Sequence, residues 1–263
     1  MRRINRAPVI VMNFSGAYNM EQFADNPDFI HIDCSDISGT DCILSAAARK
    51  TITDRISGYG ARGIHFIDSG DYHYMTKLWT DKIDEPFTLL LVDHHTDMQP
   101  SLVPGVLTCG DWVDSVIRQN KNLKEVLLIG TPREAQKTVP ENIRRKVRYV
   151  DYAEFERIVT GRHELSKGHN VYLSIDKDAL NRESAVTNWD QGEIRLDELH
   201  ALVMQLLGQE NVIGIDVCGE YPAMRNLFEE EKAASIDNRA NEVILDAVVK
   251  ARELCLDSSG FGR

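Results

Sequence analysis

The sequence predicts an α/β fold of three layers, in which helices cover both faces of a mostly parallel central sheet of about eight strands. Segments typical of strands alternate with segments typical of helices along the whole chain. Several strands, such as 87–93, are continuous apolar runs, which are typical of parallel strands buried on both faces. The 263 residues contain no linker, internal repeat or low-complexity tract. We therefore expect a single domain over residues 1–263.

The predicted strands are short apolar runs that end at turn-forming or polar residues. Ser15-Gly16 ends the first of them, and Gly130-Thr131-Pro132 ends the fifth. In chain order, the expected strands are 8–14, 29–33, 63–68, 87–93, 125–129, 147–150, 171–175 and 212–217. The order of these strands within the sheet does not follow from their pattern.

The predicted helices lie between these strands, where apolar residues recur at helical spacing. The first follows Thr40-Asp41 as its cap and runs to about residue 57, where Gly58 stops it. The others are expected at 74–80, 110–117, 132–138, 140–146, 152–160, 196–207 and 229–254. We expect the last helix to be broken or weakened near Asp237-Asn238.

The composition narrows the possible partners. A net charge of −11 argues against nucleic acid and anionic membranes, which require a basic face, and is compatible with a cationic substrate. No apolar run approaches the length of a membrane span. The five cysteines are odd in number and irregularly spaced, which favours free thiols in a reducing compartment. We therefore expect a cytoplasmic protein.

Side chains able to bind metals follow three of the predicted strands. In a parallel sheet, the carboxyl ends of the strands lie on one edge, where ligands bind. Residues at i, i+2 and i+4 of an extended segment project to one side. The residues concerned are Asp71 and His73, then Asp93, His95 and Asp97, and finally Asp176 and Asp178. Their convergence predicts one site.

Each of these residues also has a simpler explanation when taken alone. An aspartate after a strand often caps a helix or forms a turn, and His73 by itself is typical of a hydrogen-bonded histidine. Three such coincidences on one edge are less expected than one site. A ligand set this rich in carboxylates does not suit a closed structural zinc site. It suits two divalent cations such as manganese, about 3.5–4 Å apart.

Four segments resemble the motifs of the ureohydrolases, the family of arginases, agmatinases and formimidoylglutamases. Asp93-His94-His95-Thr96-Asp97 resembles the Asp-Ala-His-x-Asp motif, and Ser174-Ile175-Asp176-Lys177-Asp178 resembles the Ser-x-Asp-x-Asp motif. Ser69-Gly70-Asp71-Tyr72-His73 is similar to the Gly-Gly-Asp-His motif. The segment 214–222 resembles the later one that carries a substrate-binding glutamate. The four segments occur in the family's order.

This resemblance implies an arginase-like α/β/α domain with a parallel eight-stranded sheet and two manganese ions. The ions would share a hydroxide that attacks the planar carbon of a small cationic guanidino or amidino substrate. A linear C–N bond would break, releasing urea or a related amide and an amine. The implied metal ligands are His73, Asp93, His95, Asp97, Asp176 and Asp178.

Three residues receive further roles from the resemblance. Asp97 would be catalytic, because it would orient the hydroxide and pass a proton to the departing amine. Glu220 would bind the cationic head group, and Cys109 would line the substrate site. Family members are commonly trimers or hexamers, so the resemblance also allows a homo-oligomer.

The chain departs from the family pattern at four places. Tyr72 stands between Asp71 and His73, and His94 replaces the usual alanine. Cys109-Gly110 stands where the family commonly has His-Gly, and Glu220 comes one residue later than the pattern places its glutamate. These departures leave the guanidino or amidino substrate open.

Two alternatives remain. Asp93-His94-His95 also matches the name-giving motif of the DHH phosphoesterases, which are two-manganese hydrolases of phosphodiesters. Those proteins carry a further Asp-x-Asp metal motif near the N-terminus, and the first 60 residues contain none. The other alternative is a non-catalytic metal-binding protein of arginase-like fold.

Overall fold

The computed structural model describes residues 8–101, 105–161, 165, 168–222 and 227–260. Eight strands form one sheet in the order β2-β1-β4-β10-β9-β5-β7-β8, and every neighbouring pair is parallel. The expected eight-stranded α/β fold is therefore confirmed. In chain order, the strands are β1 (Val9–Asn13), β2 (Ile30–Asp33), β4 (Ile64–Phe66), β5 (Phe87–Val92), β7 (Leu123–Ile129), β8 (Val147–Tyr149), β9 (Asn170–Asp176) and β10 (Val212–Cys218).

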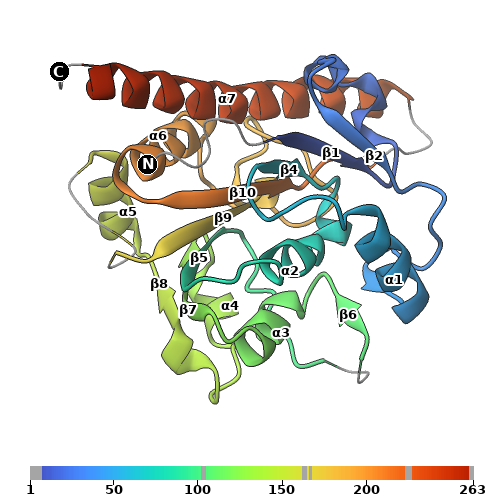
Figure 1. Ribbon diagram of the computed structural model, residues 1–263, viewed down its shortest axis with the longest axis horizontal. Coiled ribbons are helices and arrows are strands. Elements are labelled where there is room, and N and C mark those ends of the chain that lie inside the picture. Colours follow the sequence, from blue (N-terminus) through green and yellow to red (C-terminus); the bar gives the residue numbers. More distant parts are fainter. Residues whose placement is uncertain (1–7, 102–104, 162–164, 166–167, 223–226, 261–263) are drawn as a thin grey trace.

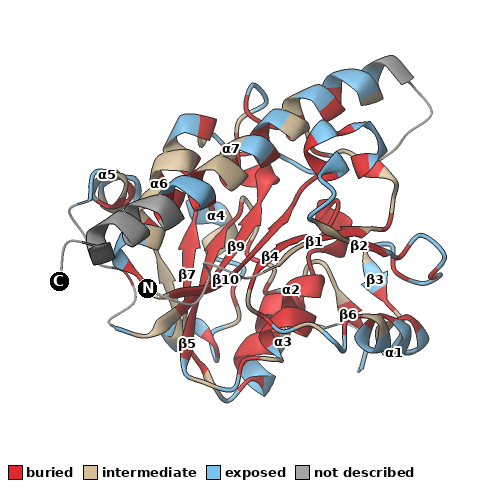
Figure 2. Cartoon of the chain, turned by 45° about the horizontal axis from the view of Figure 1, so that its top comes forward, coloured by how far each residue is buried: buried red, intermediate tan, exposed pale blue. Residues whose placement is uncertain are grey.

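Helices cover both faces of this sheet (Figure 1). The helices are α1 (Ala46–Arg55), α2 (Met75–Thr80), α3 (Trp112–Gln119), α4 (Arg133–Gln136), α5 (Tyr152–Val159), α6 (Leu196–Gln209) and α7 (Leu227–Gly260). One core cluster joins the sheet to α1, α2 and α3, and a second joins its other face to α5, α6 and α7. Figure 2 shows that the central strands β4, β5, β9 and β10 are buried along nearly their whole length.

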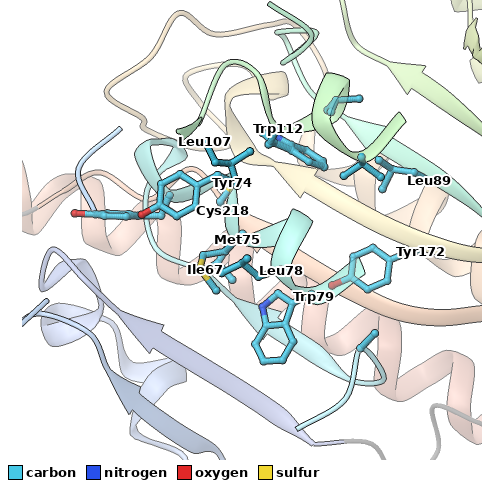
Figure 3. Packing of buried hydrophobic residues seen from close by; sticks show 14 of the residues in the cluster. Ile67, Tyr74, Met75, Leu78, Trp79, Leu89, Leu107, Trp112, Tyr172 and Cys218 are labelled. Atoms are coloured by element: carbon cyan, nitrogen blue, oxygen red, sulfur yellow. The ribbon is translucent and has the colours of Figure 1, made fainter. Parts of the chain in front are cut away.

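The apolar run of β5 is explained by its place between the two layers. Leu89 and Leu91 belong to the first core cluster, whereas Leu90 and Val92 belong to the second. All four side chains are fully buried. Figure 3 shows the first cluster, in which α2 and α3 pack against the sheet with Trp79, Trp112 and Tyr172 among the large side chains.

The order of the strands decides where the candidate ligands meet. The strands β4, β10, β9 and β5 are consecutive at the centre of the sheet. The three predicted strand ends belong to β4, β5 and β9, and β10 lies between β4 and β9. Their carboxyl ends therefore share one edge.

The start of the first helix differs from the expectation. We expected Thr40-Asp41 to cap it, but the helix begins at Ala46, and the hydroxyl of Ser45 accepts a hydrogen bond from the Ala48 amide. The residues before it form a short strand, β3 (Ile43–Leu44), which pairs antiparallel with β6 (Leu107–Thr108). This pairing joins segments over 60 residues apart in the chain and thereby holds them out of the helix.

The last helix also differs, since α7 continues without a break through Asp237 and Asn238. Asn238 accepts a hydrogen bond from the amide of Phe23 at 2.8 Å. Asp237 accepts one from the amide of Val186 at 3.0 Å. Their side chains thus bond to other segments instead of competing for the backbone of their own helix.

Two expectations from composition can be compared with the structure. Within the described ranges, no helix combines the length and apolarity that a membrane crossing requires. Four cysteines, Cys34, Cys42, Cys109 and Cys218, are free thiols, as expected. The side chain of Cys255 lies outside the described residues.

Candidate metal centre and substrate pocket

His73 lies at the centre of the candidate metal site. It follows the short 3-10 helix η3 (Gly70–Tyr72) after β4 and is buried. Its Nδ1 atom lies 3.4 Å from Asp93, 3.1 Å from Asp97 and 3.3 Å from Asp176, measured to a carboxylate oxygen of each. The extra residue Tyr72 therefore does not keep this histidine from the cluster.

The other ring nitrogen of His73 has a partner that orients the imidazole. Its Nε2 atom lies 2.9 Å from the hydroxyl of Ser174, and that hydroxyl donates to Asp216 at 2.5 Å. Because Ser174 gives its single proton to Asp216, it accepts from Nε2–H. In the neutral imidazole, Nδ1 then carries a lone pair that points at three carboxylates. This is the orientation of a metal-ligating histidine held by a hydrogen-bonded neighbour.

His95 and Asp178 form the second half of the cluster. The Nδ1 atom of His95 lies 2.7 Å from Asp178 and 3.7 Å from Asp93. Asp178 belongs to the 3-10 helix η5 (Lys177–Ala179), directly after β9. The ligand atoms of His73, Asp93 and Asp97 lie within 4.8 Å of one another, as do those of Asp93, His95 and Asp178. Asp93 belongs to both groups, as a carboxylate bridging two cations would.

The electrostatics of this cluster fit divalent cations. Burial, together with the charges of Asp178, Asp97 and Asp176, raises the pKa of Asp93 well above its usual range. Its Oδ2 atom is buried and has no hydrogen-bond partner among the residues that the structure describes. Burial alone would lower the pKa of His73, but Asp176 and Asp97 raise it to about 10. A cluster of buried carboxylates that takes up positive charge in this way has the donor set that manganese prefers.

Asp97 occupies a special backbone position. Its φ angle of 50° lies in the left-handed region, which aspartate and asparagine tolerate better than most residues. Its Oδ2 atom accepts a hydrogen bond from Nε1 of Trp112 at 2.6 Å. The same oxygen is the one that faces His73. Trp112 therefore fixes the carboxylate proposed as the catalytic group.

His94, which replaces the family's usual alanine, takes a different direction from His95. The two rings are nearly perpendicular, at 89°. The Nδ1 atom of His94 would lie 3.2 Å from a side-chain carbon built on Gly192, so His94 packs against the loop at Gly192. Its backbone amide donates to Asp178 at 3.0 Å. His94 thus supports the site through its backbone.

A pocket of about 380 Å³ opens over the cluster. Its floor includes the carboxylates of Asp93, Asp97, Asp176 and Asp178 and the ring of His95. Its walls include Cys42, Thr108, Cys109, Ala135 and Trp189. Cys109 thus lies where a substrate residue was expected, although contact with a substrate stays a prediction. Burial raises the pKa of its thiol to about 12, and its backbone amide donates to the Cys42 carbonyl at 3.0 Å.

Glu220 lies elsewhere. It is fully buried, it bonds to Nζ of Lys177 and to Nδ2 of Asn241, and it is not among the described residues that line the pocket. The preceding residue, Gly219, has a φ angle of 91°, and a side chain there would lie 2.5 Å from the carboxylate of Asp176. The one-residue offset therefore places the glutamate in an interior ion pair. This geometry gives the substrate-binding role of Glu220 no support.

The sequence reasoning gave no role to several residues that the structure places around the site. Ser174 and Asp216 orient His73, Trp112 holds Asp97, and the Cys218 thiol donates to Asp176 at 3.1 Å. Three of these residues, Ser174, Asp216 and Cys218, lie within the segments that resemble family motifs. Their place in those segments could have predicted a role at the site. Trp112 had no such signal, because only the tertiary structure brings it to Asp97.

The fold and the site together define the class of this protein. A parallel eight-stranded sheet carries imidazoles and carboxylates at the ends of its central strands, and two groups of them that share Asp93 could hold metal ions. The sequence profile of the arginase family matches residues 13–236. The chain therefore belongs to the arginase family, the ureohydrolases.

The chain is also similar in sequence to one protein of unknown function. An uncharacterized protein of Thermotoga maritima is 31% identical over 160 residues, which are 60% of this chain and 58% of that protein. The match thus spans less than two thirds of that relative's length.

Solved structures of low sequence identity share the fold. Proclavaminate amidino hydrolase of Streptomyces clavuligerus gives a TM-score of 0.62 at 15% identity and covers 96% of this chain and 97% of its own. A hypothetical agmatinase of Burkholderia thailandensis gives a TM-score of 0.60 at 20% identity and covers 95% of this chain and 89% of its own. Formiminoglutamase of Trypanosoma cruzi, solved with Mn²⁺, gives a TM-score of 0.61 at 11% identity and covers 94% of this chain and 96% of its own.

Proposed function

We propose that this protein hydrolyses a linear C–N bond of a small guanidino or amidino compound and works with two manganese ions. The observation that carries the proposal is the pair of ligand groups that share Asp93 on the floor of a pocket. Membership of the arginase family supports it, because the substrates of that family are guanidino compounds. The products would be urea or a related amide, together with an amine.

The proposed ligands divide between the two ions. His73 and His95 would each bind one ion, and Asp93, Asp97 and Asp176 would lie between them. Asp178 would complete the ion on the side of His95. When bound, the cations would lower the pKa of a water molecule toward neutrality and so supply the nucleophile.

The side chains of the pocket would handle the substrate and its protons. The planar carbon of the substrate would lie above the carboxylates, where the water attacks it and the C–N bond breaks. Asp97 would accept the proton of the water and pass it to the leaving amine. Trp112 would hold the Asp97 carboxylate in position for both transfers, through the bond from its indole nitrogen.

The alternatives make different predictions. A phosphoesterase of the DHH type loses its main support, because the chain belongs to the arginase family. A non-catalytic metal-binding protein would keep the cluster without turnover. Pocket residues that depart from the family pattern, Cys109 foremost, motivate that alternative.

Metal analysis with a substrate panel tests the proposal. Purified protein is loaded with manganese, and its metal content is measured after gel filtration. Release of urea, ammonia or amine is then assayed with guanidino compounds, amidines and phosphodiesters. We expect about two ions per chain and turnover of a guanidino or amidino compound. Failure to take up metal contradicts the site, and metal without turnover of any compound favours the non-catalytic alternative.

A matched pair of variants makes the result specific. Asp93→Asn removes charge from the carboxylate shared by both ligand groups and is expected to lower the metal content. Asp190→Asn changes an exposed aspartate that is not among the described pocket residues, and is expected to leave the metal content unchanged.

A further inference from the structure

Trp189 is a large aromatic side chain that the fold leaves partly open beside the candidate metal centre. It is 37% exposed, whereas the other two tryptophans, Trp79 and Trp112, are fully buried. It lines the pocket, and the centre of its ring lies 5.8 Å from that of His95. An aromatic ring that borders a pocket instead of the core is available to a ligand.

The orientation of this ring is fixed from several sides. Its Nε1 atom donates to Asp71 at 2.9 Å. The side chain of the adjacent Asn188 also donates to Asp71, at 3.0 Å, and the Thr187 hydroxyl donates to the backbone oxygen of Trp189 at 3.1 Å. The indole thus meets a ligand without first losing rotational freedom, which lowers the entropic cost of binding.

Gly70 allows the ring to lie this close to the cluster. A side-chain carbon built on Gly70 would lie 3.0 Å from Cδ1 of Trp189 and 3.2 Å from the carboxylate of Asp176. The backbone at Gly70 is therefore in near contact with the indole and with a proposed metal ligand at once. Any larger residue at this position would displace one of them.

The chemistry of the pocket requires a partner for a cationic head group. The proposed metal ligands have their charge directed at the ions, and Glu220 is paired with Lys177 in the interior. The face of an indole attracts a planar cation electrostatically and by stacking. Trp189 is the described pocket residue that offers such a face.

We propose that Trp189 is a substrate-binding residue that stacks on a planar amidinium or guanidinium cation, and that Asp71 positions its ring. The inference rests on the proposed function for the nature of the substrate. It selects cations over neutral compounds of the same shape, because a neutral amide has little attraction for the face of the ring.

Two ligands of matched shape test this selection. Methylguanidinium and N-methylurea are nearly isosteric and differ in charge. Their binding to the manganese-loaded protein is measured by calorimetry, for the wild type and for Trp189→Leu. We expect the replacement to weaken methylguanidinium binding by about tenfold and N-methylurea binding by less than about threefold.

Further variants separate the ring from its anchor. Trp189→Phe keeps an aromatic face and loses the bond to Asp71, so it should bind methylguanidinium more weakly than the wild type but more tightly than Trp189→Leu. Asp71→Ala leaves the ring without its anchor and should weaken the binding of methylguanidinium more than that of N-methylurea. Tyr152→Leu serves as the control, since Tyr152 is a 69% exposed aromatic residue on α5 that is not among the described pocket residues.

The outcomes distinguish this inference from the proposed function. Equal losses for both ligands in Trp189→Leu, at unchanged metal content, would overturn the role of Trp189 even if the wild type hydrolyses guanidines. A selective loss for the cation would support it even if no substrate in the panel is turned over. A lower metal content in Trp189→Leu would also overturn it, because the residue would then act on the metal site.

Discussion

The Nδ1 atom of His73 shows how much of the site depends on single atoms. It faces three carboxylates, and its direction depends on one hydroxyl, that of Ser174, at the other side of the ring. Asp216, on the neighbouring strand β10, in turn fixes the direction of that hydroxyl's proton. A change at Ser174 would therefore act on the metal through an intermediate residue.

Ser174→Ala is expected to weaken manganese binding by about 10- to 100-fold, the usual effect of losing a partner that orients a ligating histidine. The cause is that Nε2 of His73 loses its acceptor while the ring keeps its place. Manganese titration followed by electron paramagnetic resonance measures the affinity. Ser35→Ala, an exposed serine after β2, is the control. Unchanged affinity in Ser174→Ala would show that the tautomer of His73 does not depend on this bond.

Asp97→Asn is expected to lower kcat by at least about 100-fold, the range of a lost general acid–base group. The substitution suits the position, because asparagine also accepts the left-handed backbone of Asp97. His94→Ala is expected to keep nearly the full metal content, since the side chain of His94 packs away from the carboxylates. Steady-state kinetics and metal analysis of both variants check this assignment, and the opposite result would exchange the two roles.

At the scale of elements, α7 is held to the sheet by an interior network of charges. Lys177 of η5 is fully buried, bonds to Glu220 and lies 3.6 Å from Asp237 of α7. Asn241 of α7 donates both to Glu220, at 2.9 Å, and to Glu21, at 2.8 Å. Burial and the charge of Glu220 raise the pKa of Glu21 to about 11, so Glu21 is protonated at neutral pH.

Glu220→Gln is expected to lower the free energy of unfolding by about 3 kcal/mol, because buried Lys177 loses its ion pair with Glu220. Glu21→Gln is expected to change it by less than about 1 kcal/mol, because that carboxyl group is already neutral. Urea denaturation measures both. For a substrate identified in the panel, KM should stay unchanged in Glu220→Gln, and a large rise in KM at unchanged stability would restore the substrate-binding role.

At the scale of the whole molecule, the proposed metal site would couple metal binding to folding. Buried Asp93, Asp176 and Asp178 and the partly exposed Asp97 converge from two strand ends, and burial and Asp176 raise the pKa of Asp178 to about 6. Cations that bind only the folded chain add their binding free energy to its stability. If the proposed ions bind, the cluster would make the stability of the fold dependent on metal.

Removal of manganese by a chelator is expected to lower Tm. At a metal concentration 1,000 times Kd, one site contributes about 4 kcal/mol of stability. Differential scanning calorimetry with and without chelator measures the difference. In Asp93→Asn the same treatment should have a smaller effect, and an equal drop in both proteins would place the stabilising metal elsewhere.

His65 gives the fold a dependence on pH that does not involve the metal ligands. It is buried, stacks on Trp79 with ring centres 3.9 Å apart, and lies 3.2 Å from the hydroxyl of Tyr172. Burial lowers its pKa from 6.5 to about 3. Between about pH 6.5 and about pH 3, His65 takes up a proton in the unfolded chain but stays neutral in the folded chain. The free energy of unfolding therefore falls as the pH decreases through this range.

His65→Phe is expected to reduce this loss, by up to about 1.4 kcal/mol for each pH unit in that window. The phenyl ring keeps the stacking with Trp79 and cannot be protonated. Unfolding free energies of chelator-treated wild type and variant, measured between pH 6.5 and 4 by urea titration, give the two slopes. Parallel slopes would show that His65 is not protonated on unfolding in this range.

The sequence by itself determined the features that depend only on residues close together in the chain. The eight strands of the sheet, most of the helices between them and the candidate ligands at three strand ends follow from apolar runs and from spacings of two residues. The helix expected at 140–146 is instead only the 3-10 turn η4 (Arg144–Lys146). Such patterns act locally, because a strand buried on both faces must be apolar wherever it lies in the sheet. The family motifs occupy the same short segments, so they too were visible in the sequence.

Only the tertiary structure decided which distant side chains meet. It placed β10 between β4 and β9, directed Glu220 to Lys177, and brought Trp189 to Asp71 over a separation of 118 residues. It also kept α7 continuous, because Asp237 and Asn238 found partners in other segments. The physical reason is the same in each case. A buried polar group must form a hydrogen bond, and the packing of the whole chain decides which partner lies within reach.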